Sequence, residues 1–287
     1  MDSQQFESWL DDPHRPTLVM GVLNVTPDSF SDGGQFLDPA AAEEQALQMA
    51  AQGADLIDIG AESTRPGSQR VPADEQIHRL RPVLARLGRQ PPCTLSIDTT
   101  RADVVRLALD HGVSLVNDIS AGRDDPTMLP LVASRGVPVI LMHMRGQPAD
   151  MQQDPRYEDV VLEVRAFLAE RLAVAARAGI QPGRVLLDPG IGFGKTLQHN
   201  LSLLAGLSAL ASLGRPLVVG TSRKGFIGRL TGRDDPRQRL WGTAASVAWC
   251  AANGAAIARV HDVEPMVAVV RVARAISAAG RSPVPPV

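Results

Sequence analysis

The sequence predicts an α/β protein with a parallel (β/α)8 TIM barrel fold. Short apolar runs rich in Val, Ile and Leu alternate with longer Ala- and Leu-rich stretches of helical spacing, and this alternation indicates βα units and a parallel sheet. Eight strand-like runs and eight helical stretches occur in strict order. That number favours a closed barrel over an open doubly wound sheet, which more often has about five or six strands.

Each unit pairs one apolar run with the helical stretch that follows it. In order, strand 18–23 leads to helix 39–52, 55–59 to 73–87, 94–97 to 102–111, 114–116 to 126–135, 138–142 to 159–178, 184–187 to 197–213, 217–219 to 238–253 and 256–260 to 264–279. Barrels of this type run to about 250 residues or more, so residues 1–287 are expected to form a single domain. We expect a core of about residues 17–280, a flexible N-terminal segment and a loosely ordered Pro-rich tail.

The composition argues for a small-molecule partner. Basic and acidic residues nearly balance, 29 against 31, and the basic residues form no stripe, so neither nucleic acid nor a membrane is expected as a partner. The N-terminal segment lacks the basic and apolar regions of a signal peptide, and no run approaches the roughly 18 apolar residues of a membrane span. Cys93 and Cys250 lack metal-ligand spacing, which argues against a zinc site or a disulfide framework. We expect a cytoplasmic protein.

Polar residues follow every expected strand. In a parallel barrel the carboxyl ends of all strands meet at one mouth, where barrel active sites lie. The residues that arrive there, strand by strand, are Asn24; Glu62, Thr64 and Arg65; Asp98; Asn117 and Asp118; His143 and Arg145; Asp188; Ser222, Arg223 and Lys224; and Arg259, His261 and Asp262. Their convergence predicts one active site at the C-terminal ends of the strands.

The segment 188–196, DPGIGFGKT, superficially resembles a phosphate-binding P-loop. Three residues separate Gly190 from Gly194, whereas a P-loop has four at this place, which argues against binding of a nucleoside triphosphate. The glycines alone indicate a tight turn. Asp188 and Asn117 have a functional interpretation as well: a carboxylate accepts two donors and an amide both donates and accepts, which suits the amino and ring N–H edge of a guanine-like heterocycle.

Other polar residues at the mouth remain open to two interpretations. Asp98 and Asp118 either bind a ligand or cap the helices that follow them. Lys224 is either a solvated charge or an inward cation that meets a ring carbonyl or ring nitrogen.

Arg259 and His261 lie on one face of the last strand because side chains alternate. A guanidinium can stack on a ring or grip a phosphate, and an imidazole can donate to a phosphate oxygen. A structural ion pair with Asp262 is the alternative. His143, between two methionines, is at least as well explained as a packed core group, so we assign it no catalytic role.

Two loops, 26–34 and 62–71, are rich in Gly, Ser, Pro and Asp. They are either solvated connections or mobile covers that close over a substrate. In the second case Asp28, Arg65 and Pro66 reach the site on closure.

Several segments together resemble the dihydropteroate synthase family. They are NVTPDSFSDGG at 24–34, ESTRPGS at 62–68, SIDTT at 96–100, VNDISAG at 116–122, LMHMRG at 141–146, DPGIGFGKT at 188–196, TSRKGFIG at 221–228 and RVHDV at 259–263. The resemblance extends over almost the whole chain, and TPDSFSDGG together with STRPG makes it highly specific.

The resemblance implies a Mg²⁺-dependent transferase of folate biosynthesis that is a homodimer and a sulfonamide target. The family condenses 6-hydroxymethyl-7,8-dihydropterin pyrophosphate with p-aminobenzoate to give 7,8-dihydropteroate and pyrophosphate, through an SN1-like loss of pyrophosphate. By matching positions, the implied pterin ligands are Asp98, Asn117, Asp188, Lys224 and Arg259. Those for pyrophosphate are Asn24, Arg259 and His261, with Asn24 also at the metal. Those on the p-aminobenzoate side are Asp28, Phe30, Thr64, Arg65, Pro66, Phe193 and Ser222. The implied catalytic set is Asp98, Lys224, Arg259 and His261.

A few positions depart from the family pattern. Ala61 stands where relatives often have a second glycine, Thr100 where many have Tyr, and Gly225-Phe226 replaces a more usual Ser-Met pair. None of these changes removes a matched catalytic group. Two alternatives are a methyltetrahydrofolate-binding methyltransferase domain, which has no use for the pyrophosphate residues, and a non-catalytic pterin-binding paralogue, against which the two intact loops argue.

Overall fold

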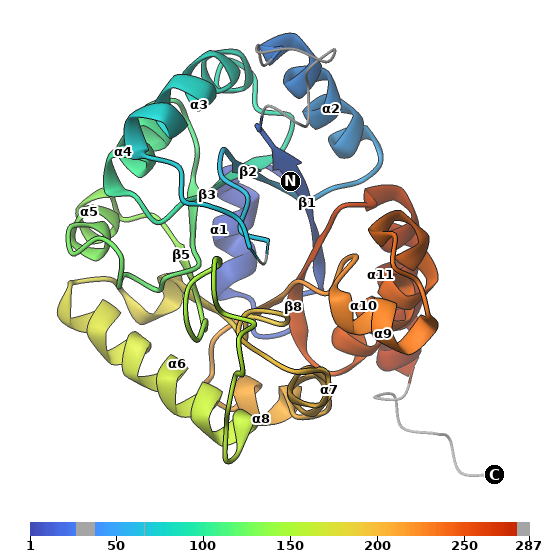
Figure 1. Cartoon of the computed structure of the whole chain (residues 1–287). Coiled ribbons are helices and arrows are strands. Elements are labelled where there is room, and N and C mark those ends of the chain that lie inside the picture. The colour runs from blue at the N-terminus through green and yellow to red at the C-terminus, as the bar shows by residue number, and fades with distance from the viewer. Residues whose placement is uncertain (27–37, 66, 280–287) are drawn as a thin grey trace.

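The computed structural model describes residues 1–26, 38–65 and 67–279. Its centre is a closed barrel of parallel strands that pair in chain order, with the last strand beside the first (Figure 1). The strands are β1 Leu18–Asn24, β2 Leu56–Gly60, β3 Thr94–Asp98, β4 Leu115–Asp118, β5 Val139–Met142, β6 Val185–Asp188, β7 Leu217–Val219 and β8 Ala255–Val260. The predicted (β/α)8 barrel is confirmed.

Helices surround the strands, and all except α1 lie around the outside of the barrel (Figure 1). They are α1 Ser3–Asp11, α2 Pro39–Ala51, α3 Ala73–Leu87, α4 Ala102–Asp110, α5 Met128–Arg135, α6 Val160–Arg177, α7 Leu197–Ala205, α8 Leu207–Ala211, α9 Gly225–Thr231, α10 Leu240–Ala252 and α11 Val263–Ala279, with 3₁₀ turns at Pro182–Arg184 and Pro236–Arg239. The stretch predicted as one helix over 197–213 forms two, which meet at Gly206. No helix in the described part of the chain is long and apolar enough to cross a membrane.

Several strands continue one residue beyond their apolar run. The apolar run of β3 ends at Ile97, yet the ladder continues to Asp98, which pairs with Gly60 and Asn117 on the neighbouring strands. β6 likewise includes Asp188. Sheet hydrogen bonds therefore hold the backbone of these polar residues, which places their side chains more rigidly than a loop would.

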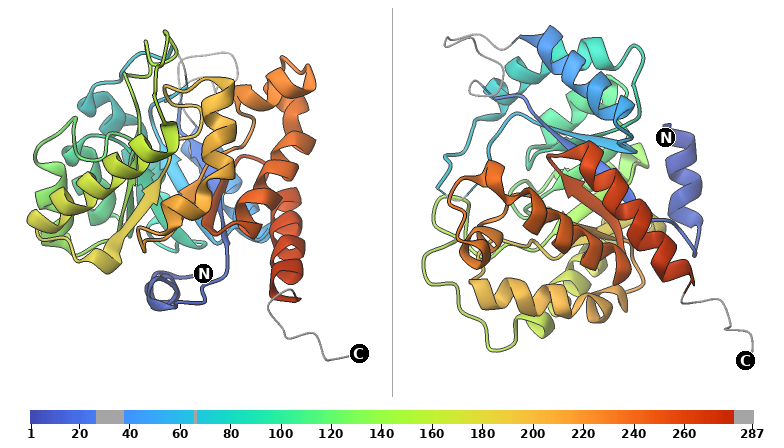
Figure 2. Two further views of the ribbon diagram at one scale, coloured as in Figure 1. Left: turned by 90° about the horizontal axis from the view of Figure 1, so that it is seen from below. Right: turned by 90° about the vertical axis from the view of Figure 1, so that its right-hand side faces the viewer.

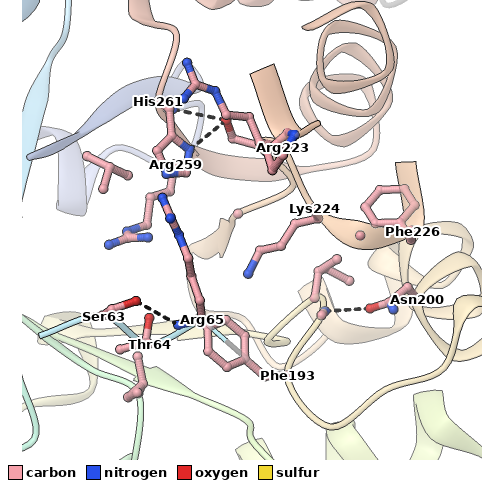
Figure 3. Close-up of a pocket in the computed structure, with 18 of the residues that line it drawn as sticks. Ser63, Thr64, Arg65, Phe193, Asn200, Arg223, Lys224, Phe226, Arg259 and His261 are labelled. Atoms are coloured by element: carbon pink, nitrogen blue, oxygen red, sulfur yellow. Dashed lines mark hydrogen bonds between the residues drawn. The ribbon is translucent and has the colours of Figure 1, made fainter. Parts of the chain in front are cut away.

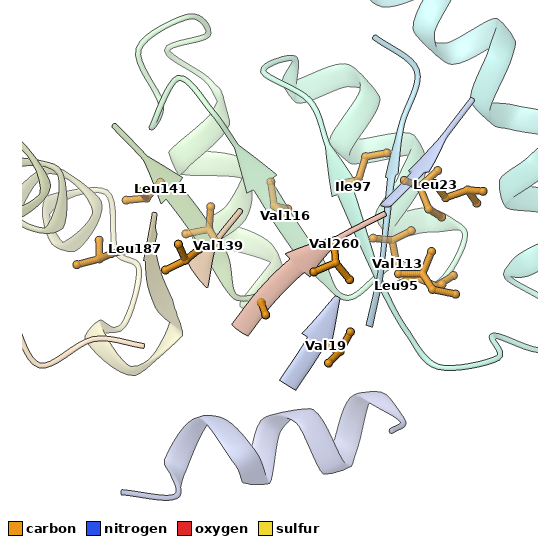
Figure 4. Close-up of a cluster of buried hydrophobic side chains, with 14 of the residues drawn as sticks. Val19, Leu23, Leu95, Ile97, Val113, Val116, Val139, Leu141, Leu187 and Val260 are labelled. Carbon is orange, nitrogen blue, oxygen red and sulfur yellow. The ribbon is translucent and has the colours of Figure 1, made fainter. Parts of the chain in front are cut away.

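Alternation along each strand sorts the side chains between two apolar layers. On β1, Met20 faces the barrel interior, whereas Val19 and Leu23 pack outward under the helices. The strand side chains that face the interior in this layer are Leu18, Met20, Leu56, Leu115, Ile140, Leu186, Val218 and Ile257, and Ala256 belongs to the same cluster. Figure 4 shows part of the larger outer layer. Positions two residues beyond the inner layer point in the same direction, toward the mouth.

The N-terminal segment is not the flexible tail that the sequence predicts. It forms α1, which begins with a capping box and lies across the end of the barrel opposite the mouth (Figure 2). Its Phe6, Trp9 and Leu10 are buried against the inner apolar layer. The segment is polar on average, but these three residues share one helical face, so packing against the barrel floor stabilises the helix.

We predict that Phe6→Ala lowers the free energy of unfolding by about 3 kcal/mol, because it leaves a cavity beneath the barrel. Phe6 is 1% exposed, and its ring stacks on Trp9 with the centroids 5.5 Å apart. Chemical denaturation measures the change, with the exposed Gln4→Ala on the same helix as control. Equal stability of the two variants would mean that α1 unfolds independently of the barrel.

Candidate active site

A cavity of about 890 Å³ lies at the mouth of the barrel (Figure 3). This volume is typical of small-molecule sites. The predicted site residues that line it are Asn24, Thr64, Arg65, Asp98, Asn117, Asp188, Phe193, Ser222, Lys224, Arg259 and His261. Asp28, Phe30 and Pro66 lie outside the described residues. The strand ends thus bring most of the predicted residues to one place.

Arg259 lies between two carboxylates at the inner end of the cavity. Its Nε is 2.7 Å from Asp58 Oδ2, and its Nη2 is 2.8 Å from Asp98 Oδ2. Burial alone would lower the pKa of a guanidinium, but these carboxylates outweigh it and raise the pKa of Arg259. The alternative ion pair with Asp262 is not formed by Arg259, because Asp262 pairs with Arg223 instead.

Asp58 on β2 is a site residue that the pattern of strand ends does not reveal, since it lies inside an apolar run. It is fully buried, and besides Arg259 it accepts a hydrogen bond from Asn117 Nδ2 at 2.8 Å. The alternation of side chains along β2 is the sequence feature that could have identified Asp58. Leu56 faces the barrel interior, so Asp58, two residues further on, faces the same way.

Asp98 and Asp118, for which the sequence allowed either ligand binding or helix capping, have different roles. Asp98 lines the cavity, and burial raises its pKa although Arg259 opposes the rise. Its Oδ1 has no hydrogen-bond partner among the residues that the structure describes. Asp118, by alternation, faces away from the cavity and accepts from the backbone N–H groups of Ser120 and Gly122. Asp118 is therefore a local structural residue.

Asp188 reaches the cavity at the start of the glycine-rich loop. Its Oδ1 accepts from the backbone N–H of Gly190 at 2.6 Å, which leaves the other oxygen for a ligand. Burial raises the pKa of Asp188 to about 6, although that hydrogen bond and nearby Lys224 favour the carboxylate.

The glycines of this loop are required by a close backbone approach. Gly190 and Gly194 have φ angles of +66° and +63°. A Cβ atom on Gly190 would overlap the backbone oxygen of His143, and one on Gly194 would overlap that of Arg145. The loop after β6 thus packs directly on the chain that follows β5, which only glycine permits.

The chain contains two lysines, and both line the cavity. Lys224 Nζ lies 4.1 Å from the centroid of the Phe193 ring, and its pKa is lowered to about 8 by burial and then by Arg259. Lys195 is 3% exposed; its ammonium donates to Phe193 O at 2.9 Å and lies 3.0 Å from Nδ1 of the buried His143. Burial lowers the pKa of Lys195 to about 7. Lys224 therefore points into the cavity, as the second interpretation of the sequence predicted. His143 is a packed core group, as the sequence also predicted.

His261 is oriented by Ser222. Ser222 Oγ accepts the backbone N–H of His261 at 3.1 Å and lies 3.0 Å from the ring Nδ1. The hydroxyl keeps its own hydrogen for Nδ1, and when it donates there the ring proton lies on Nε2. Burial, followed by Arg259, lowers the pKa of His261 to about 3. At neutral pH the imidazole is therefore an uncharged hydrogen-bond donor.

The loop that carries Thr64 and Arg65 is anchored at its base. Gln76 on α3 is fully buried; its amide donates to Glu62 Oε2 at 3.1 Å and accepts from Thr99 Oγ1 at 2.8 Å. Glu62 is therefore an anchor of the loop. Figure 3 shows Arg65 directed from this loop into the cavity.

The chain matches a sequence profile described as "Pterin binding enzyme" over residues 20–261. The dihydropteroate synthase of Mycobacterium leprae is 48% identical over 271 residues, which are 92% of this chain and 95% of that protein. The chain belongs to the dihydropteroate synthase family.

Two solved dihydropteroate synthase structures from Xanthomonas albilineans are similar to this barrel. One, with 4-aminobenzoic acid, has a TM-score of 0.86 and 47% identity over 93% of this chain and 94% of that chain. The other, in complex with 7,8-dihydropteroate, has a TM-score of 0.82 and 44% identity over 93% and 95%. The predicted family is confirmed, and with it a transferase of folate synthesis. The match favours the synthase over the methyltransferase domain.

We predict that Gly190→Ala destabilises the protein more than Gly214→Ala. Both positions have left-handed φ angles, +66° and +71°, so both variants lose about 1–2 kcal/mol through backbone strain. Only at Gly190 would the new methyl group also meet a backbone oxygen, whereas nothing lies within 4 Å of it at Gly214. Urea denaturation of both variants measures the difference, and equal losses would contradict the close approach.

Proposed function

We propose that this cavity condenses 6-hydroxymethyl-7,8-dihydropterin pyrophosphate with p-aminobenzoate, giving 7,8-dihydropteroate and pyrophosphate. The observation that carries the proposal is the division of the cavity into two chemical halves. Hydrogen-bond acceptors lie at the inner end of the cavity on Asp98, Asn117 and Asp188. Donors lie beside them on Arg259 and His261. A flat ring with amino groups suits the first half and a diphosphate suits the second.

The pterin is bound by the acceptor half. Asp188 has one oxygen free of the loop, and Asp98 Oδ1 is buried without a partner in the described ranges, so each can accept an N–H of the ring system. Lys224 donates to a ring carbonyl or ring nitrogen. Ile119 and Met142 line the same cavity and belong to one apolar cluster, which suits the faces of a flat ring.

The pyrophosphate is bound by Asn24, Arg259 and His261. Within residues 1–26, 38–65 and 67–279 no group of three or more His, Cys, Asp or Glu side chains is placed to hold a metal. Mg²⁺ commonly needs only one or two protein oxygens when substrate phosphates supply others, so the oxygen of Asn24 fits a Mg²⁺ that arrives with the substrate. The metal neutralises charge on the departing pyrophosphate when bound.

The p-aminobenzoate side is formed by Thr64, Arg65, Phe193 and Ser222, together with Asp28, Phe30 and Pro66 outside the described residues. Phe193 offers an aromatic face next to Lys224. Arg65 supplies a cation for the carboxylate of p-aminobenzoate from a loop whose base is anchored.

The reaction breaks the bond between the pterin methylene carbon and the bridging oxygen first, and the electron pair leaves with pyrophosphate. The electron-rich dihydropterin delocalises the resulting cation, and the carboxylate of Asp98 stabilises it. The amino nitrogen of p-aminobenzoate, neutral at pH 7, then forms the new bond and releases its proton to solvent. Because this nucleophile needs no activation, the site needs no dedicated general base.

The proposed assembly is a cytoplasmic homodimer of chains that each form one pterin-binding domain. Large apolar side chains on the surface support an interface between copies: Trp241 is 81% exposed and Trp249 50%. Aromatic residues are enriched at protein interfaces relative to the rest of the surface.

We predict Mg²⁺-dependent release of pyrophosphate that rises when p-aminobenzoate is present. Asp98→Ala and Lys224→Ala should each lower turnover at least about a hundredfold, the order seen when one group that stabilises transition-state charge is lost. Asp110→Ala, an exposed carboxylate paired with Arg135, serves as the matched control. Normal turnover in both site variants would remove them from catalysis, and pterin binding without turnover in the unaltered protein would favour the non-catalytic paralogue.

We predict that pterin affinity weakens as the pH falls below 6. The pKa of Asp188 is raised to about 6 by burial, so the carboxylate that accepts a ligand donor through its free oxygen is protonated below that pH. The dissociation constant should then rise by up to about tenfold per pH unit. Fluorescence titration between pH 5 and 8 measures it. In Asp188→Asn binding should be weak throughout, and an unchanged slope in that variant would assign the titration to another group.

A further inference from the structure

Asp58 Oδ2 accepts hydrogen bonds from two residues that face the cavity. It accepts Asn117 Nδ2 at 2.8 Å and Arg259 Nε at 2.7 Å. Asp58 does not itself line the cavity and is fully buried beneath it. It therefore acts on a ligand only through the two side chains that it holds.

The contact with Asp58 determines which way round the Asn117 amide lies. A carboxylate oxygen accepts hydrogen bonds, so the amide end that faces it must be the NH₂ group. One N–H is used by Asp58, which leaves the amide oxygen and the second N–H for the cavity in one fixed order. If the amide turned over, its oxygen would face a carboxylate at hydrogen-bond distance, which is electrostatically unfavourable in a buried site.

Arg259 strengthens this constraint from the other side. It is joined to Asp58 and to Asp98, so Asp58 cannot rotate toward another partner without leaving a half-buried guanidinium with one carboxylate in place of two. Removing one partner of such a buried pair is strongly unfavourable. The orientation of the amide is thereby tied to strands β2, β4 and β8.

We propose that Asp58 is a specificity-determining residue, which makes the site recognise a pterin by fixing the orientation of the Asn117 amide. This inference rests on the proposed pterin binding. At the edge of a pterin, an amino donor lies beside a ring nitrogen acceptor. A lumazine has a carbonyl acceptor beside a ring N–H, so the pattern is reversed while the shape is kept. A fixed amide distinguishes the two patterns, and an amide that can turn over accommodates either.

The test compares the affinities for 6-hydroxymethylpterin and 6-hydroxymethyllumazine by fluorescence titration at pH 7. Asp58→Ala should reduce the preference for the pterin about tenfold, the order expected for one hydrogen bond in a buried site. Asp58→Asn can place an oxygen where Oδ2 lies and should keep most of the preference. A preference unchanged in Asp58→Ala, or lost equally in both variants, would overturn the proposal.

Ser96→Ala is the matched control. Ser96 pairs with Asp58 across β2 and β3 and is fully buried, and its hydroxyl has no hydrogen-bond partner in the described part of the chain. Its removal should leave the preference as it is. A loss as large as that in Asp58→Ala would attribute the effect to general disturbance of the barrel interior.

Two further variants separate the amide from other effects. Asn117→Ala should itself reduce the preference, which keeps the proposal testable if Asp58→Ala does not fold; an unchanged preference would overturn it. Adding Asp58→Ala to Asn117→Ala should change the preference no further, because the amide through which Asp58 acts is already absent. A further drop would mean that Asp58 acts through Arg259. If the unaltered protein binds neither compound, the proposed pterin function fails, and not only the role of Asp58.

Discussion

The site depends on one buried charge arrangement, the guanidinium of Arg259 held between Asp58 and Asp98. These residues lie on β8, β2 and β3, and Arg259 lies 201 positions after Asp58 in the sequence. They meet because the barrel closes and all three side chains point inward near the mouth. Loss of Arg259 would leave the buried carboxylates of Asp58 and Asp98 without their cation, and leaving a buried charge unpaired typically costs about 3–5 kcal/mol. The fold and the site therefore stabilise the same arrangement.

This arrangement orients neutral groups as well as charged ones. Asn117 is held by Asp58, and the imidazole of His261 is oriented by Ser222. Burial keeps that imidazole uncharged and draws the pKa of Lys224 down to about 8. Groups that are already oriented need little reorganisation when charge develops on a substrate. The pocket thus combines fixed dipoles with a small number of buried cations.

The two ends of the barrel divide stability from chemistry. At the floor, α1 covers the inner apolar layer with Phe6 and Trp9 (Figure 2). At the mouth, the same inward positions become polar, and the glycine loop packs on the chain after β5 where a methyl group would not fit. Changes at the floor affect stability alone, whereas changes at the mouth affect recognition as well. This division is general for parallel barrels.

The sequence by itself determined the barrel, the order of its units and the family motifs, because strand and helix periods and local motifs are short-range patterns. It also located most of the site, since strand ends converge in any parallel barrel. Tertiary structure decided the rest. Asp98 and Asp118 look alike in sequence, yet one residue of strand parity turns the first into the cavity and the second away. Asp58 gains its partners only when the barrel closes, and α1 gains its stability only from the floor on which it packs. Contacts between distant segments are what local patterns cannot contain.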